Sequence, residues 1–231
     1  MDELYSRTKK FILSKGAHVV GIAPINRFDE APHGHKPQDI LSDARSVIVF
    51  ANRNPDSIVM DGPATSYHHM MITFYNKLDL IANETANYLE QQGKAAIPIP
   101  SDDPYFDWNP DKVHGRGDLS HKHAAQAAGM GKLGKNSLLI TPEFGNRVQL
   151  ASIVTNADLE PDPEIKSELC PAECTLCLEA CPVSAITGGQ VVNQKLCRSY
   201  MFLELPKGQN IYGCRECRKT CTVGVKSRAT T

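Results

Sequence analysis

Residues 170–182 read CPAECTLCLEACP, and this stretch decides how the chain is organised. Its four cysteines are separated by three, two and three residues, and a proline directly follows the fourth. The other four of the eight cysteines in this 231-residue chain are Cys197, Cys214, Cys217 and Cys221. Thiols packed this densely, with none in the first 169 residues, indicate metal binding.

The spacing C-x2-C-x3-C-P is typical of the segments that hold [4Fe–4S] clusters in bacterial ferredoxins. In that pattern the last cysteine of the run binds the other cluster of the pair. The sequence therefore predicts two clusters with crossed ligands. The first cluster is expected on Cys170, Cys174, Cys177 and Cys221, and the second on Cys181, Cys197, Cys214 and Cys217.

Two features depart from the ferredoxin pattern, although neither removes a ligand. One extra residue separates Cys170 from Cys174, and Thr222 stands where a proline usually follows the last cysteine. An alternative is two structural zinc sites with four cysteines each, although zinc sites usually show two well-separated C-x2-C pairs. Disulfides are a further alternative, but they require an oxidising compartment.

Residues 195–231 are rich in basic side chains. Only Glu204 and Glu216 are acidic there. The basic residues are Lys195, Arg198, Lys207, Arg215, Arg218, Lys219, Lys226 and Arg228. This excess either offsets the negative charge of thiolate-bound clusters, which raises their potential, or forms a solvated basic surface.

The residues before the cysteines have the composition of a folded domain. Apolar residues make up 41% of the chain and charged residues 22%. Apolar periodicity predicts helices at 3–15, 67–92 and 120–128. Short apolar, β-branched runs predict strands at 18–23, 46–51, 95–99, 138–141 and 148–155. Residues 26–37, 54–63 and 100–118 are expected to be loops. Alternating helices and strands favour an α/β or α+β layer domain.

Nothing in the sequence predicts export or a membrane span. The start of the chain, Met1 to Tyr5, lacks a basic segment followed by an apolar one. The longest apolar runs, such as residues 46–51, fall far short of the roughly 20 residues that cross a bilayer. We therefore expect a cytoplasmic protein that has no membrane partner. Its net charge of −1 also argues against polyanion binding by bulk charge.

Four further stretches resemble the epoxyqueuosine reductases, which are relatives of the reductive dehalogenases. They are residues 124–140 (AAQAAGMGKLGKNSLLI), 142–145 (PEFG), 197–200 (CRSY) and 211–214 (IYGC). The resemblance implies a nitroreductase-like, corrinoid-binding α/β (α+β) domain at residues 1–162. It also implies a ferredoxin-like domain with two [4Fe–4S] clusters at residues 163–231. In that family, electrons pass through the clusters to the cobalt of cobalamin, which performs the reduction.

The sequence departs from that family where its proton donor is expected. The family has an Asp-x-x-Pro-x-x-Glu-Arg segment before its glycine-rich loop, and the Asp position falls near Gly115. Asp118 and His114 are the predicted substitutes, if the loop shifts. The chain also stops soon after Cys221, without the helical repeats by which the family holds tRNA. We therefore expect a small-molecule substrate rather than tRNA.

The glycine-rich stretch 129–137 has the outline of a dinucleotide-binding loop. It follows a predicted helix and enters a predicted strand, whereas a dinucleotide loop does the reverse. One interpretation is a helix C-cap followed by a tight turn. The other is that backbone N–H groups and polar side chains approach a cofactor. The candidate cofactor-binding residues are Gly129, Gly131, Gly134, Lys135 and Asn136.

Two functions of different classes remain open. The first is a corrinoid-dependent reductase, in which FMN is an alternative to cobalamin because nitroreductase-like folds commonly hold it. The second is a non-catalytic electron carrier, or a reductase subunit for another corrinoid or flavin protein. Either would receive electrons from a donor such as a ferredoxin or a flavodoxin.

Overall fold

The computed structural model describes residues 3–111 and 113–224, so Met1, Lys226 and Arg228 lie outside the described residues. Its centre is a four-stranded sheet with the order β1-β2-β8-β3. These strands are β1 (Val19–Pro24), β2 (Ser46–Arg53), β3 (Ala96–Ile99) and β8 (Val148–Thr155). Every neighbouring pair is antiparallel, and β2 pairs with β8 from Ser46↔Thr155 to Arg53↔Val148.

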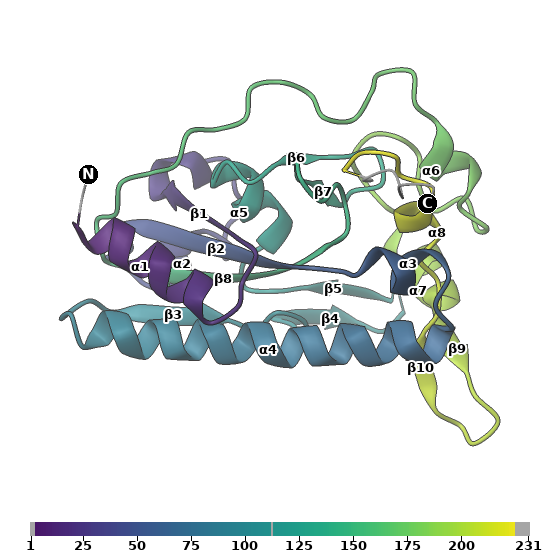
Figure 1. Ribbon diagram of the computed structural model, residues 1–231, viewed down its shortest axis with the longest axis horizontal. Coiled ribbons are helices and arrows are strands. Elements are labelled where there is room, and N and C mark those ends of the chain that lie inside the picture. The colour runs from purple at the N-terminus through teal and green to yellow at the C-terminus, as the bar shows by residue number, and fades with distance from the viewer. Residues whose placement is uncertain (1–2, 112, 225–231) are drawn as a thin grey trace, which may run out of the picture.

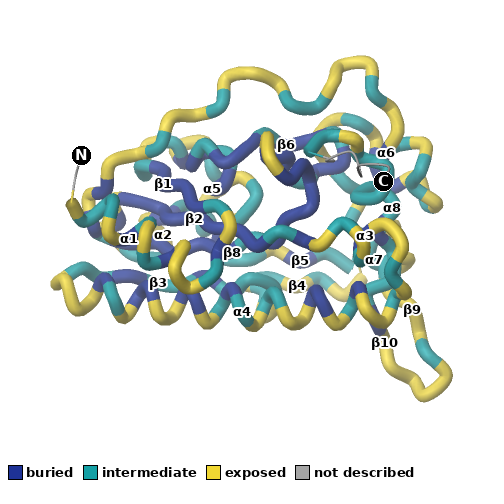
Figure 2. Tube along the Cα trace, viewed as in Figure 1, coloured by how far each residue is buried: buried dark blue, intermediate teal, exposed yellow. Residues whose placement is uncertain are grey.

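Helices cover both faces of the sheet (Figure 1). On one face, α1 (Glu3–Ser14) and α4 (Ala64–Glu90) pack against Ile48 and Phe50 of β2. On the other, α5 (His121–Ala127) packs against Val47 and Val49. Strand β2 is therefore buried on both sides, which explains its continuous apolar sequence (Figure 2). The predicted mixed α/β layers are confirmed.

Several predicted loops contain short regular elements instead. They are η1 (Ile25–Phe28), α2 (Pro37–Ile40), α3 (Asp56–Met60), β4 (Asp107–Asn109) and β5 (His114–Arg116). These elements are three to five residues long, which is too short for a periodic sequence signal. The strand expected at 138–141 is only β7 (Leu139–Ile140), and it pairs with β6 (Lys132–Leu133) outside the main sheet.

The cysteine region is built from short elements. They are α6 (Leu176–Glu179), α7 (Gln194–Met201), β9 (Phe202–Glu204), β10 (Asn210–Tyr212) and α8 (Glu216–Lys219). They gather at one end of α4, and the β9–β10 hairpin projects beyond it (Figure 1). The Tyr212 N–H donates to His68 Nδ1 on α4 at 3.2 Å.

Residues 156–175 form an irregular strap from the end of β8 to α6 (Figure 1). Asp162 fixes its start, because its carboxylate accepts hydrogen bonds from Lys9 Nζ, the Tyr5 hydroxyl and the Ile22 N–H, each at 2.8 Å. Beyond this anchor most residues up to 169 are exposed. Within the described part of the chain, no helix has both the length and the apolar character needed to cross a bilayer.

Candidate cluster-binding site and adjoining cavity

The cysteine thiols fall into two neighbouring groups. Burial raises the pKa of Cys177, and the nearby thiolates of Cys170, Cys174 and Cys221 raise it further. These same four residues line one small cavity. Burial likewise raises the pKa of Cys197, and the nearby thiolates of Cys214 and Cys181 raise it further. The structure therefore places Cys170, Cys174 and Cys221 near Cys177, and Cys181 and Cys214 near Cys197, while the assignment of these thiols to two clusters stays a prediction.

Cys217 lies where the two sets meet. Burial raises its pKa to about 12, and the charges of Cys197, Cys214 and Cys177 also act on it. All eight cysteines are free thiols, so the structure contains none of the disulfides that were an alternative. Among the described residues, no three or more His, Cys, Asp or Glu side chains form a group that could hold a metal ion. The four cysteines of the first set line one small cavity together.

Backbone N–H groups point at several of the sulfurs. The Ala185 N–H donates to Cys181 Sγ at 3.2 Å. Against the raising effect of burial, backbone hydrogen bonds from Val223 and Glu216 lower the pKa values of Cys221 and Cys214. Such bonds stabilise negative sulfur and tune the potential of a bound cluster. The donor set therefore fits two clusters, whose binding stays a prediction.

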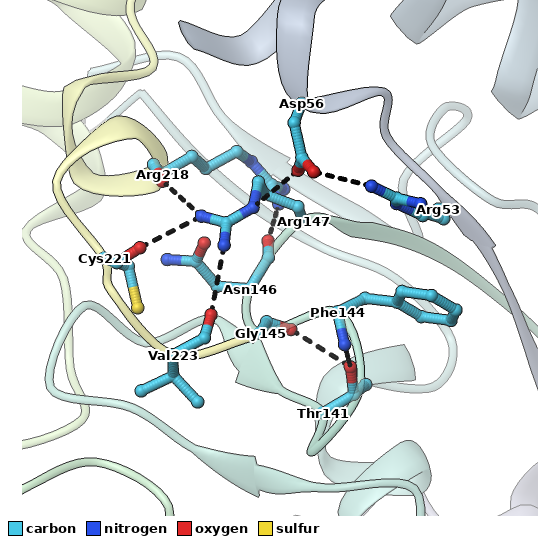
Figure 3. Close-up of polar contacts among 10 residues, drawn as sticks. All are labelled: Arg53, Asp56, Thr141, Phe144, Gly145, Asn146, Arg147, Arg218, Cys221 and Val223. Carbon is cyan, nitrogen blue, oxygen red and sulfur yellow. Dashed lines mark hydrogen bonds and ion pairs between the residues drawn. The ribbon is translucent and has the colours of Figure 1, made fainter. Parts of the chain in front are cut away.

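Arg147 ties the end of the cysteine region to the sheet (Figure 3). Its side chain is 1% exposed, and its Nη1 donates to the carbonyls of Cys221 at 3.0 Å and Arg218 at 3.2 Å. Its Nη2 donates to Val223 O at 3.1 Å, and its Nε pairs with Asp56 at 3.1 Å. A buried guanidinium with all three nitrogens bonded fixes this segment in one position.

The glycine-rich stretch supplies further tethers. Lys135 Nζ donates to the carbonyls of Ala172 and Cys174, the latter at 2.8 Å. Asn136 Nδ2 donates to Cys217 O at 3.2 Å, and Asn146 Nδ2 donates to the same oxygen at 3.0 Å. Two of the candidate cofactor-binding residues thus hold the cysteine loops. Their predicted approach to a corrinoid stays a prediction.

The three glycines of that stretch allow close backbone contacts. Gly129 has φ +70° and ends α5, with the Gly129 N–H bonded to Gln126 O and the Met130 N–H to Ala125 O. This is the Schellman C-cap arrangement. A Cβ at Gly129 would clash with Pro163 O, and a Cβ at Gly131 or Gly134 would clash with Ile140. The stretch follows α5, contains β6 and leads into β7, so it lacks the context of a dinucleotide loop.

A cavity of about 300 Å³ lies beside the second cysteine set. Arg198 and Arg218, which directly follow Cys197 and Cys217, line it from the cysteine region. From the other elements it is lined by Tyr75, Pro100, Ser101, Asp102, Tyr105, Ser120, His121, Lys122 and several apolar residues. The cavity therefore adjoins the residues that follow Cys197 and Cys217.

The polar groups of this cavity have defined protonation states. His121 Nε2 donates to Pro100 O at 2.8 Å, and burial lowers its pKa, so the neutral ring accepts the Ser152 hydroxyl at Nδ1. Burial raises the pKa of Tyr105 and Tyr212, and both hydroxyls donate to Asp102, at 3.2 and 2.6 Å. The tyrosines are therefore protonated donors at neutral pH.

The two predicted proton donors lie elsewhere. His114 is half-buried in β5 and Asp118 half-buried after it, and neither is among the described residues that line the cavity. A second cavity, of about 710 Å³, adjoins the same segment and is lined by Gly115, Arg116 and Gly117, again without these two side chains. A catalytic role for them stays a prediction.

Sequence reasoning missed four residues that shape the cavity, namely Asp102, Tyr105, Arg198 and Arg218. Asp102 and Tyr105 lie in the segment 100–118, for which the sequence predicts only a loop. The signal for Arg198 and Arg218 was the arginine that directly follows Cys197, Cys214 and Cys217. That repeated Cys-Arg pair places cations beside the expected second cluster.

Comparison with known proteins shows what the chain is similar to. No family model matches it. It is 37% identical over 222 residues to the epoxyqueuosine reductase of Gloeobacter violaceus, covering 90% of this chain and 65% of that protein. It is 40% identical over 114 residues to that of Listeria monocytogenes, covering 46% of this chain and 30% of that protein. The match thus spans less than two thirds of these relatives.

Solved structures share the fold. Epoxyqueuosine reductase from Streptococcus thermophilus superimposes with a TM-score of 0.67 at 19% identity, over 96% of this chain and 66% of that chain. The catabolic reductive dehalogenase NpRdhA superimposes with a TM-score of 0.71 at 19% identity, over 95% of this chain and 31% of that chain.

The fold therefore places the chain among the mixed α/β proteins that include epoxyqueuosine reductases and B12-dependent reductive dehalogenases. By sequence, the chain is a homologue of the epoxyqueuosine reductases, as its motifs predicted.

Proposed function

We propose that this protein is an iron–sulfur reductase that passes electrons through two [4Fe–4S] clusters to an acceptor in the adjoining cavity. One observation carries the proposal: the eight thiols form two neighbouring sets of four, and residues next to the second set line the cavity. The second cluster is then the last relay before the acceptor. The first cluster, on the loops that Lys135 holds, receives electrons from a ferredoxin or flavodoxin.

The positions of the arginines favour electron transfer from the first cluster to the second. Arg198, Arg215 and Arg218 each lower the pKa of the cysteine that precedes them, against the raising effect of burial. The same positive charge favours the reduced, more negative state of a cluster and therefore raises its potential. In the first set, Arg147 acts in this way on Cys221, after burial and a backbone hydrogen bond. Electrons are therefore expected to move from the first cluster to the second.

Cobalamin is the cofactor expected from the epoxyqueuosine reductases, and it supplies a strongly reducing cobalt centre when bound. The cavities of about 300 and 710 Å³ share Gly117, Leu119, Ser120 and Lys122 on their walls. Both volumes lie in the range of ligand pockets. Gln126, Gln194 and Arg27 on the larger cavity offer hydrogen bonds that suit the amide rim of a corrinoid. These residues fit the group, whereas Lys135 and Asn136 line the cavity of the first cysteine set.

The proposed acceptor is a small molecule rather than tRNA. The position of the family's acidic residue falls near Gly115, whose N–H instead donates to Gln194 Oε1 at 3.2 Å. A cavity of about 300 Å³ is also the size of a small substrate.

The second candidate function is an electron-transfer protein without its own substrate. It is favoured by the absence of Asp118 and His114, the two predicted proton donors, from the described walls of both cavities.

Anaerobic reconstitution, followed by addition of cob(II)alamin under EPR and visible spectroscopy, separates the two candidates. We expect about eight irons per chain and a base-off cob(II)alamin signal at a stoichiometry near one. An intact iron–sulfur spectrum beside an unchanged cobalamin spectrum would favour the electron-transfer protein. Iron content well below four per chain would contradict both. A Cys214→Ser variant is the control, because it should lose the second cluster only.

A further inference from the structure

Three cationic side chains line the 300 Å³ cavity without a carboxylate partner among the described residues. Lys122 Nζ donates only to the Ser137 hydroxyl. Arg198 donates to the Tyr105 hydroxyl at 3.2 Å and to Gln194 Oε1 at 3.1 Å, and its guanidinium stacks on the Tyr105 ring. The third cation is Arg218.

Arg218 donates to backbone carbonyls rather than to an acid. Its Nη1 bonds the carbonyl of Asn146 and, at 3.4 Å, that of Val148. Asp102 is the acidic side chain on the described wall, and its two oxygens accept the Tyr105 and Tyr212 hydroxyls. The wall therefore carries more positive than negative charge.

With a cluster beside the two arginines and Asp102 on the wall, Lys122 is still a cation that contacts no carboxylate among the described residues. A cluster on the second cysteine set would offset Arg198 and Arg218, which adjoin its ligands. Lys122 enters the cavity from α5, and burial lowers its pKa with no anion to compensate. Lys122 is half-buried and its described partner is a hydroxyl, so an anion that reached it would gain a charge-assisted hydrogen bond.

The rest of the wall defines the body of such an anion. Apolar side chains line the cavity together with the rings of Tyr75 and Tyr105; they are Leu119, Leu138, Leu139, Val148 and Leu150. A fully hydrated inorganic ion would leave these surfaces without contacts. A charged group on an apolar body satisfies both parts of the wall.

We propose that this cavity binds a small organic anion, a carboxylate or phosphoryl group on an apolar body, with the charged group held by Lys122 and the arginines Arg198 and Arg218. As a statement of substrate class this rests on the proposed function, but the binding site itself does not.

The test uses the reconstituted full chain under anaerobic conditions, with calorimetric titration of benzoate, its neutral isostere benzamide, and inorganic phosphate. We expect benzoate to bind roughly tenfold or more tightly than benzamide, the usual worth of a charge-assisted hydrogen bond. Phosphate binding without benzoate binding would identify the phosphoryl form of the ligand. Equal binding of benzoate and benzamide, or no binding of any probe, would overturn the proposal.

The variant Lys122→Gln should weaken benzoate roughly tenfold and leave benzamide unchanged. Lys122→Arg should restore most of the affinity, and Lys10→Gln, at an exposed position on α1, is the matched control. Unchanged benzoate affinity in Lys122→Gln would contradict the assignment. Iron content, measured in each sample, distinguishes the two proposals. Anion binding without clusters removes only the reductase, and clusters without binding of either benzoate or phosphate remove only the anion site.

Discussion

The sheet and the cysteine region are held together by different forces. In the sheet, Val47, Ile48, Val49 and Phe50 of β2 are fully buried between two helical layers. In the described part of the cysteine region, the buried apolar residues are Cys177, Ala185, Ile186 and Ile211. That region is held instead by cations and amides that bond to backbone carbonyls. Its order should therefore depend on its ligands and its tethers.

The difference matters for electron transfer. Burial of apolar side chains stabilises the fold but is not directional, whereas a hydrogen bond to a particular carbonyl fixes the position of the groups it joins. The sheet thus provides a stable support, and the tethers set where each thiol lies. Four substitutions test this division, beginning with the largest expected effect.

Replacing a ligand should separate the two regions most clearly. In Cys217→Ser we expect loss of about four of about eight irons, because one thiolate of the second set is missing. Amide hydrogen exchange should rise in residues 194–221 and stay slow in β2 and β8. Equal loss of protection in β2 would show that the sheet is not independent of the clusters.

Arg147→Met removes the central tether. We expect the free energy of unfolding to fall by about 3 kcal/mol, since three carbonyls lose their partner and Asp56 keeps only its ion pair with Arg53. Urea denaturation measures the loss. The control is Arg116→Met, whose exposed pair with Asp107 should contribute at most about 1 kcal/mol. A loss in Arg147→Met no larger than the control would remove Arg147 from this role.

Gly145→Ala should displace the segment that follows Cys221 by a steric clash. A Cβ there would clash with Val223 O, and the φ of +56° already disfavours a side chain. We expect a loss of about 2 kcal/mol. Faster exchange should be confined to residues 221–224. As a control, Gly34→Ala has the same kind of φ but open space around it, so it should show the backbone cost alone.

Ile48→Val tests the opposite region and should have the smallest effect. One methyl group leaves a fully buried site, which costs about 1 kcal/mol of unfolding free energy. Iron content and the EPR spectrum should not change. A variant that loses iron in proportion to stability would show that the two regions unfold as one unit.

The sequence predicted the parts that depend on local pattern. Strand 46–51 was found because a strand buried on both faces must be continuously apolar, and the cysteine sets follow from spacing. It could not reveal Arg147, because arginine is ordinarily exposed and nothing in the neighbouring sequence marks this one as buried. Nor could it assign Asp102, whose partners Tyr105 and Tyr212 meet it only in the folded chain.

The exposed strap between Asp162 and the cysteine region should tolerate changes in its length and sequence. The strap begins after Thr155, at the end of β8 (Figure 1). Arg147 directly precedes Val148, at the start of β8, and its side chain bonds to the cysteine region. The position of the cysteine region therefore depends more on these hydrogen bonds than on the strap. Doubling the length of the strap should lower the free energy of unfolding by only about 0.6 kcal/mol. Insertions between Glu164 and Glu168 would be tolerated, and a protease cut there would leave two fragments that stay associated.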